Sequence, residues 1–274
     1  MSAQILRVVY ILMFTAKLKR IRQLSESTRD FRFVRTDGEP VQYAPGQFFR
    51  FVFEDAAGEF ERSYSLCNFK DTAPDVMDLV ISKVQGGRAT KLLFESGLEE
   101  LEAKVTGPFG RLILPKESPG RLILAATSVG LAPYMPILRQ LLQLHYASVV
   151  LLLGVRDRSE FIYGDELLDY AAKNDFFELR LCLSREQAEA KHEYDGYVTA
   201  QVEDLQPAIK TDHYLLCGNP QMIDDVWGHL KEIGFRPRQV VREKYVFARE
   251  KKAASADLTA EQKRLIAEKM KKYS

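Results

Sequence analysis

Cysteine is scarce in this sequence, and neither sign of charge is in excess. The 274 residues include three cysteines, Cys67, Cys182 and Cys217, which lie far apart in the chain. An odd number at this spacing forms neither a disulfide framework nor the C-x-x-C pattern of metal and iron–sulfur sites, and it favours a reducing cytoplasm. Lys and Arg number 39 against 38 Asp and Glu, so the net charge of +1 provides no global field for a nucleic acid or a membrane surface.

Long apolar runs are absent too. The stretch 5–14, ILRVVYILMF, is interrupted by Arg7 and is too short to span a bilayer, and no small-residue cleavage site follows it. We expect it to be an extra strand or an upstream extension of the true start. Internal repeats and low-complexity tracts are likewise missing. A content of 46% hydrophobic and 28% charged residues is typical of a soluble globular protein, here long enough for two domains.

Residues 14–115 have the pattern of a domain made of short strands. Alternating segments are separated by turn signals such as Asp37-Gly38 and Pro45-Gly46, and one helix-like insertion, ATKLLFESG at 89–97, interrupts them. Several strands at this spacing predict an antiparallel barrel or sandwich. The candidate strands are 14–24, 31–36, 47–53, 62–67, 76–84, 101–106 and 111–114.

Residues 120–247, which follow a Pro-Gly-containing linker at 115–120, have a different pattern. Continuous apolar runs alternate with segments of helical periodicity, which indicates a parallel sheet covered on both faces. The handedness of the crossovers then predicts a doubly wound α/β nucleotide-binding domain. The apolar runs are 121–126, 148–153, 178–183, 213–217 and 238–241, and the helical stripes are 137–142 and 222–233.

The tail 248–274 forms a third, small piece. Thr259 and Gln262 give a T-x-x-Q capping box that opens a short helix, with Ile266, Met270 and Tyr273 on one side. Two interpretations stay open for this basic segment. It is either a solvated helix packed on the body of the protein or a docking surface for an acidic partner.

Three loops of the second domain follow apolar strands, where an open α/β sheet binds its ligand. TSVGLAP at 127–133 presents backbone N–H groups before a helix opened by Pro133, which suits a phosphate. SRE at 184–186 offers a hydroxyl and a guanidinium where the adenosine ribose is read, and CGNPQM at 217–222 ends the fourth strand. Each loop alone is equally compatible with a purely structural role, since Cys217 could be a buried thiol and Arg185 a surface cation.

Together with EFERSYSLCNF at 59–69, these loops resemble the bacterial type of the ferredoxin–NADP⁺ reductase family over residues 14–247. The resemblance implies an FAD-binding barrel in which Arg62 of R-x-Y-S holds the FAD pyrophosphate, Tyr64 stacks on the isoalloxazine and Ser65 hydrogen-bonds near flavin N5. Leu66 would also contact FAD. Gly87, Ala89 and Thr90, in the motif GRAT, match the family's second phosphate loop, and GPFG at 107–110 closes the flavin domain.

In the second domain the resemblance implies a site for NADP(H). The turn that receives the dinucleotide contains Thr127, Gly130 and Pro133, although Ser128 and Val129 depart from the family's Gly and Thr. The 2′-phosphate contacts would be Arg156, Ser184 and Arg185, although Tyr197 stands where bacterial members often carry a further arginine. The residues around the nicotinamide would be Cys217, Gly218, Met222, Glu243 and Tyr245, the last followed by 29 further residues rather than the chain end.

The family's activity is electron transfer between NADP(H) and a one-electron protein carrier, ferredoxin or flavodoxin, by hydride exchange at flavin N5. The resemblance implies that Ser65, Cys217 and Glu243 shape the catalytic pocket. Because iron–sulfur cysteines are missing, we expect a separate, acidic carrier that meets the basic tail and Lys17, Lys19, Arg20 and Arg22. Two alternatives stay open: a reductase of free flavin or of an oxygenase partner that uses NADH, and a non-catalytic flavin-bearing electron-transfer or regulatory subunit.

Overall fold

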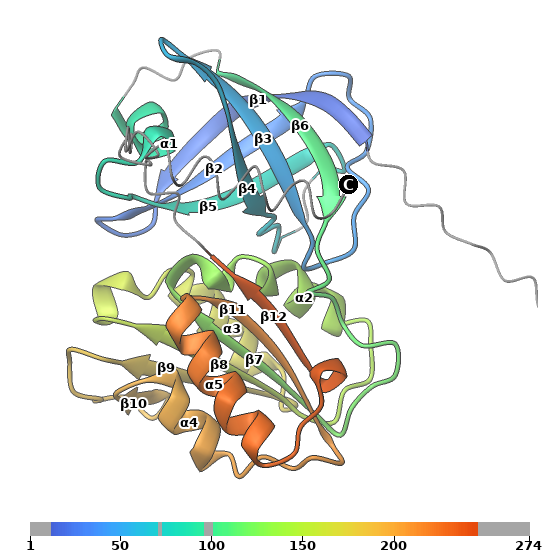
Figure 1. Ribbon diagram of the computed structural model, residues 1–274, viewed down its shortest axis with the longest axis vertical. Helices are drawn as coiled ribbons and strands as arrows, with labels where there is room; N and C mark the ends of the chain where they lie inside the picture. The colour runs from blue at the N-terminus through green and yellow to red at the C-terminus, as the bar shows by residue number, and fades with distance from the viewer. Residues whose placement is uncertain (1–11, 71–72, 96–100, 246–274) are drawn as a thin grey trace, which may run out of the picture.

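One antiparallel and one parallel sheet, each with six strands, form the two domains of this protein (Figure 1). The computed structural model describes residues 12–70, 73–95 and 101–245. The tail 248–274 and most of the apolar stretch 5–14 lie outside these residues. Among the described residues, no helix has both the length and the apolar character needed to cross a membrane.

The antiparallel sheet has the strand order β4-β3-β6-β1-β2-β5. The two edge strands of this sheet are β4 and β5. Just beyond the end of β4, an antiparallel bridge between Leu66 and Leu79 of β5 joins the two edges, so the sheet curls into a barrel. The short α1 (Arg88–Thr90) and the following π-helical turn (Lys91–Glu95) cover one end. The strands are β1 (Leu12–Gln23), β2 (Thr28–Arg35), β3 (Phe48–Asp55), β4 (Gly58–Ser65), β5 (Val76–Ser82) and β6 (Glu102–Phe109).

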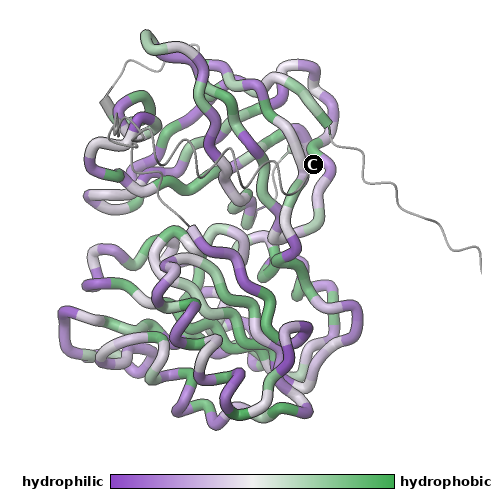
Figure 2. Tube along the Cα trace, viewed as in Figure 1, coloured by the Kyte–Doolittle hydropathy of each residue, from purple (hydrophilic) through white to green (hydrophobic). Residues whose placement is uncertain are grey.

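Phenylalanine fills the barrel. Along β3, Phe49, Phe51 and Phe53 are fully buried while the residues between them are more exposed, which is the period-2 alternation of a strand with one face in the core. Phe33 of β2 meets Phe51 edge to face, with 5.4 Å between ring centroids. Figure 2 shows the same division, with hydrophobic residues alternating with hydrophilic ones along the barrel strands.

The segment 111–114 was expected to be a strand and is not one. Gly110 has a φ of +99°, which turns the chain out of the barrel after β6. Leu112 is then buried against Gly46, where a Cβ would lie 1.8 Å from the Leu112 carbonyl oxygen. The segment therefore forms the crossing between the domains rather than a seventh strand.

The parallel sheet has the strand order β10-β9-β8-β7-β11-β12, and the order reverses between the neighbouring strands β7 and β11. An antiparallel barrel followed by a doubly wound parallel sheet confirms the expected fold class. The short β10 was not expected. The strands are β7 (Arg121–Thr127), β8 (Val149–Val155), β9 (Phe177–Leu183), β10 (Glu193–Asp195), β11 (Asp212–Gly218) and β12 (Val240–Lys244).

Helices cover both faces of this sheet, because its strands are apolar on both sides (Figure 1). One face packs against α2 (Tyr134–Leu141) and α3 (Gly164–Lys173), and the other against α4 (Val198–Asp204) and α5 (Pro220–Glu232). Three short 3₁₀ turns complete the domain: η2 (Ser128–Leu131) follows β7, η3 (Arg158–Glu160) follows β8, and η4 (Pro237–Gln239) precedes β12.

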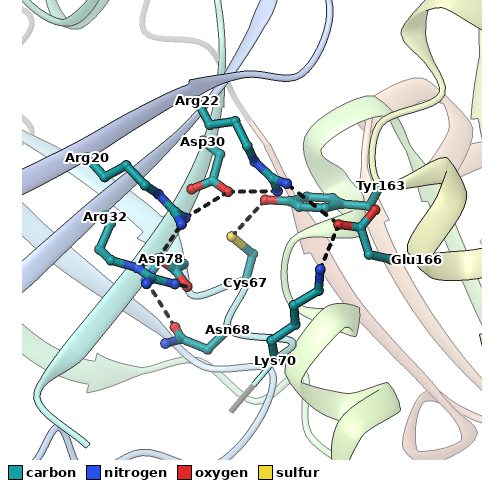
Figure 3. A network of polar contacts seen from close by, with 10 residues as sticks. All are labelled: Arg20, Arg22, Asp30, Arg32, Cys67, Asn68, Lys70, Asp78, Tyr163 and Glu166. Carbon is teal, nitrogen blue, oxygen red and sulfur yellow. Dashed lines mark hydrogen bonds and ion pairs between the residues drawn. The ribbon is translucent and has the colours of Figure 1, made fainter. Parts of the chain in front are cut away.

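A network of charged side chains joins the barrel to α3 (Figure 3). Arg22, near the end of β1, donates to Asp30 Oδ2 at 3.0 Å, and its Nη1 lies 3.6 Å from Glu166 Oε1 of α3. Lys70 Nζ lies 3.6 Å from the same Glu166 oxygen. Burial raises the pKa of Asp30, and the nearby Asp78 carboxylate raises it further. Glu166 thus bridges two cations of the barrel from the parallel-sheet domain.

Two further contacts cross the same boundary. The buried thiol of Cys67 lies 3.4 Å from the hydroxyl of Tyr163, a residue held at a φ of +55° just before α3. Ser25 and Ser27, in the turn between β1 and β2, donate to Glu160 Oε2 at 3.0 and 2.9 Å. These contacts stabilise one relative orientation of the two domains and therefore the shape of the cleft between them.

Candidate active site between the two domains

A cavity of about 720 Å³ lies between the barrel and the carboxyl ends of the parallel strands. It is located where the strand order of the parallel sheet reverses, which is where open α/β sheets bind ligands. The barrel contributes Ser27, Ser82, Lys83 and Val84. The nucleotide domain contributes most of the remaining wall, including Thr127, Ser128, Val129, Gly154, Arg156, Ser184, Tyr197, Gly218, Asn219, Met222 and Tyr245.

Ser65, Glu243 and Tyr245, three residues singled out from the sequence, meet at one end of this cavity. Tyr245 donates from its hydroxyl to Ser65 Oγ at 2.8 Å, and Ser65 in turn donates to Glu243 Oε1 at 3.2 Å. Ser65 ends β4 of the barrel, whereas Glu243 lies on β12 of the other domain. The structure therefore joins β4 of the barrel to β12, the last strand of the parallel sheet, through three polar side chains.

The parallel pairing of β11 with β12 places Cys217 beside this group. Cys217 is the register partner of Glu243, and the backbone N–H of Tyr245 donates to the Gly218 carbonyl at 2.9 Å. Gly218 has a φ of +119°, and a Cβ there would lie 2.5 Å from Thr127 Oγ1, so only glycine fits between the two strand ends.

Burial controls the protonation of this group. It raises the pKa of Glu243 to about 7, although the hydrogen bond from Ser65 acts in the opposite direction. It also raises the pKa of the Cys217 thiol well above its ordinary value. Cys217 is therefore a neutral thiol at physiological pH, not a nucleophile, whereas Glu243 changes protonation near neutrality.

Strand β4 places the R-x-Y-S residues on both of its faces. The strand period puts Arg62 and Tyr64 on one face and Ser65 on the other. The Tyr64 ring contacts Phe51 edge to face, with 5.8 Å between centroids. The Arg62 guanidinium donates only to the neighbouring Glu61 carbonyl, at 2.7 Å, and makes no ion pair within the described residues. Their binding of FAD stays a prediction, as does that of the fully buried Leu66.

The GRAT segment folds into a compact turn. The Thr90 hydroxyl accepts from the Val84 N–H at 2.8 Å, and Ala89 and Thr90 are buried. The Gly87 N–H donates to the Val84 carbonyl at 2.9 Å. The Thr90 side chain thus holds the turn itself together, and the turn's backbone N–H groups are the part that could meet a phosphate.

The turn after β7 is more tightly wound than the sequence suggested. A 3₁₀ turn follows Thr127 directly, and Ser128 within it has a φ of +50°. Gly130 packs against β11, since a Cβ there would lie 2.5 Å from the Cys217 carbonyl oxygen. Pro133 is buried at the start of α2. Thr127 and Ser128 therefore face the cavity, whereas Gly130 and Pro133 lie behind its wall.

The expected 2′-phosphate residues lie together at the ends of β8 and β9. The Arg185 N–H donates to the Arg156 carbonyl at 2.8 Å, and Ser184 Oγ donates to the Val155 carbonyl at 3.2 Å. Both arginine side chains are exposed and form no ion pair within the part of the chain that the structure describes. Tyr197 is 69% exposed at the same end of the cavity.

Sequence reasoning missed Lys83 and Glu160, which line the cavity from opposite domains. Lys83 follows β5 by one residue and is exposed. Glu160 lies in η3 and holds the serines of the β1–β2 turn. No local pattern marks either residue, because each acquires its place only when the two domains come together.

Comparison with known proteins supports both domains. The family described as "Oxidoreductase FAD-binding domain" matches residues 15–113, and that described as "Oxidoreductase NAD-binding domain" matches residues 124–227. The chain is 29% identical over 242 residues to "Ferredoxin--NADP reductase B" of Sorangium cellulosum, with coverage of 85% of this chain and 97% of that protein.

Two further similarities come from Amycolatopsis. The chain is 30% identical to the "Aromatic O-demethylase, reductase subunit" over 84% of its own length and 69% of that protein. It also superposes on the crystal structure of "cytochrome P450 reductase GcoB" with a TM-score of 0.75 and 28% identity, covering 86% of this chain and 71% of that one. The chain therefore belongs to the ferredoxin reductase-type family of oxidoreductases that bind FAD and NAD(P)H.

Proposed function

We propose that this oxidoreductase passes electrons between NADP(H) and a one-electron protein carrier, ferredoxin or flavodoxin. The observation that carries the proposal is the hydrogen bond from Tyr245 to Ser65, which links the flavin strand to the last strand of the nucleotide domain at the end of the cavity. When bound, FAD supplies the two-electron chemistry with the nicotinamide and the one-electron chemistry with the carrier.

Side chains on β4 and at the end of β11 support this proposal. Arg62 carries a guanidinium that no carboxylate neutralises within the described residues, as a pyrophosphate contact requires, and Tyr64 is an aromatic two positions further on the same face of β4. Gly218 lets the ends of β7 and β11 pack closely where the cavity begins, and the Cys217 thiol beside it is neutral. In our proposal, Arg62 and Tyr64 hold the flavin. Met222 lines the place of the nicotinamide, and the fully buried Cys217 lies behind its wall.

Ser65, Glu243 and Tyr245 have separate tasks in this proposal. Tyr245 occupies the end of the cavity beside Ser65, so its ring must move aside before a nicotinamide reaches the same place. Ser65 keeps its hydroxyl oriented by one donor and one acceptor. Glu243 Oε1 accepts from Ser65, and its pKa of about 7 allows it to hold or release a proton near neutral pH.

NADP(H) is favoured over NAD(H) by the charges at the far end of the cavity. Arg156 lines the cavity there, and Arg185 lies beside it, connected by a backbone hydrogen bond. Neither forms an ion pair among the residues described. Two uncompensated guanidinium groups suit a 2′-phosphate, whereas an NAD site requires a free carboxylate for the ribose hydroxyl.

A reductase for an oxygenase partner is the second candidate, because a relative of 30% identity is the reductase subunit of an aromatic O-demethylase. The basic residues of β1, expected to contact an acidic carrier, do not show which of the two candidates is correct. Arg20 and Arg22 both form ion pairs with Asp30 inside the molecule, so they contribute less positive charge to a docking site than the sequence suggested.

The deciding experiment is a visible spectrum of the purified protein before and after anaerobic addition of NADPH, followed by addition of ferredoxin, flavodoxin or an oxygenase component. We expect a yellow protein that NADPH bleaches and that ferredoxin or flavodoxin reoxidises. A colourless protein that takes up no FAD would contradict the assignment of the cofactor to this chain. A yellow protein that neither NADPH nor NADH bleaches would favour a non-catalytic subunit.

A further inference from the structure

Arg158, which the proposed function does not use, organises the loop that carries Arg185. It lies in η3 after β8. Its guanidinium donates two hydrogen bonds to the carboxylate of Glu193 in β10, from Nε to Oε1 at 2.8 Å and from Nη2 to Oε2 at 2.7 Å. The Glu193 side chain is only 5% exposed. A bidentate pair of this kind fixes both the distance and the orientation of the two groups.

The same arginine also holds Glu186, the residue that directly follows Arg185. The Arg158 backbone N–H donates to Glu186 Oε2 at 2.8 Å, and its Nη1 donates to the same oxygen at 3.2 Å. Its Nη2 reaches the Gln187 carbonyl at 2.6 Å. One side chain thus contacts both ends of the loop between β9 and β10.

The contacts of Arg158 with Glu186, Gln187 and Glu193 are called the clamp below. Glu193, the first residue of β10, also binds the backbone of the loop between β9 and β10. Its Oε2 accepts from the backbone N–H groups of Glu189 at 2.8 Å and Ala190 at 3.0 Å. Arg158 and these N–H groups lower the pKa of Glu193 to about 2. The pair of Arg158 and Glu193 therefore stays ionised across the physiological pH range, and the loop keeps its shape.

The clamp affects nucleotide binding because the Glu186 side chain carries a negative charge next to the proposed 2′-phosphate site. A carboxylate after this strand favours a ribose 2′-hydroxyl and repels a 2′-phosphate. Here Arg158 pairs with the Glu186 carboxylate and compensates part of its charge, since it also pairs with Glu189 and Glu193. Arg156 and Ser184 line the cavity, whereas Glu186 and Arg185 lie just outside its lining. Releasing Glu186 would add a negative charge next to Arg185 and loosen the loop that bears it.

We propose that Arg158 is a positioning residue that sets the preference for a 2′-phosphorylated nucleotide, by holding Glu186 away from the cavity and Arg185 beside Arg156. This inference rests on the proposed NADP(H) site, but it concerns the recognition of the 2′-phosphate alone. It can therefore be tested by binding, without turnover and without a protein carrier.

The test compares the binding of 2′,5′-ADP and 5′-AMP to the FAD-loaded protein by calorimetry. Arg158→Ala is expected to weaken 2′,5′-ADP about tenfold and to leave 5′-AMP within about twofold. The double variant Arg158→Ala/Glu186→Gln is expected to recover part of the lost 2′,5′-ADP affinity, because the released side chain then has no charge. Arg158→Lys is expected to weaken 2′,5′-ADP nearly as much as Arg158→Ala, because an ammonium cannot donate two parallel hydrogen bonds to Glu193.

Arg180→Ala is the matched control. Arg180 lies on β9 of the same sheet and also pairs with two carboxylates, Glu178 and Asp204, at 2.6 Å each, but it does not line the cavity. It should leave both affinities unchanged. Equal loss of 2′,5′-ADP and 5′-AMP in Arg158→Ala, or no loss of either, would overturn the inference, as would a wild-type protein that binds both probes equally. Failure of NADPH to bleach the flavin, by contrast, would count against the proposed function.

Discussion

Tyr245 and Ser65 are 180 residues apart in the chain, and the hydroxyl of the first donates to the hydroxyl of the second at 2.8 Å. Tyr245 reaches this position because its backbone N–H continues the pairing of β12 with β11 onto Gly218. The contact holds the aromatic ring in the wall of the cavity, where we propose that the nicotinamide binds.

Removing the Tyr245 ring should ease entry of the nicotinamide. Tyr245→Ala is expected to tighten the binding of NADP⁺ at least several-fold, measured by the change in the flavin spectrum on titration. Tyr245→Phe is the matched control, because it keeps the ring and removes only the hydrogen bond to Ser65, and it should bind NADP⁺ within about twofold of wild type. Equal effects of the two substitutions would show that the ring does not obstruct the site.

Arg62 is expected to hold FAD through its charge. A charge-assisted hydrogen bond contributes roughly 1.5–3 kcal/mol, so Arg62→Ala should raise the dissociation constant of FAD by at least about tenfold. Tyr64→Ala should weaken FAD as well. The ratio of flavin to protein after gel filtration measures both, with the exposed Arg238 in η4 changed to alanine as a control. If both variants keep a full complement of flavin, then β4 does not form part of the flavin site.

Glu243 should make stability depend on pH. Burial raises its pKa from 4.5 to about 7, so between these values the folded protein keeps a proton that the unfolded chain has released. Stability conferred by this proton is complete below about pH 4.5 and is lost as the pH rises through 7, a change on the order of 3 kcal/mol. Glu243→Gln should reduce the fall in melting temperature between pH 5 and pH 8.

The control for Glu243 is Glu232→Gln, which changes an exposed carboxyl in the last turn of α5. This variant should show the same difference in melting temperature between the two pH values as wild type. If Glu243→Gln also shows the wild-type difference, then Glu243 is ionised throughout the range and does not carry the proton.

Glu166 is expected to stabilise the arrangement of the two domains. Glu166→Gln removes the charge that faces both Arg22 and Lys70 across the boundary, from a side chain that is only 17% exposed. A loss of ~1 kcal/mol corresponds to a melting temperature lower by about 2–4 °C in a protein of this size. Asp169→Asn, which breaks an exposed pair with Lys173 on the same helix, should change it by less than about 1 °C.

Local patterns in the sequence determined the two sheets and most of their strands. Alternation around Phe49, Phe51 and Phe53 indicates one buried face, and the unbroken apolar runs of β7, β8 and β11 indicate strands buried on both faces. The exceptions are informative. Segment 111–114 is largely apolar but leaves the barrel at the turn of Gly110 and forms no strand, and β10 is too short to show a period.

The sequence by itself also determined which residue types to expect at the site, because Arg62, Ser184 and Cys217 stand in recognisable short motifs. Only the tertiary structure decided which of these residues meet. The contacts of Tyr245 with Ser65 and of Ser27 with Glu160 join separate domains. The clamp of Arg158 on Glu186 joins loops after two different strands. Such contacts depend on how strands and domains are placed in three dimensions, and no periodicity along one chain segment encodes a partner on another.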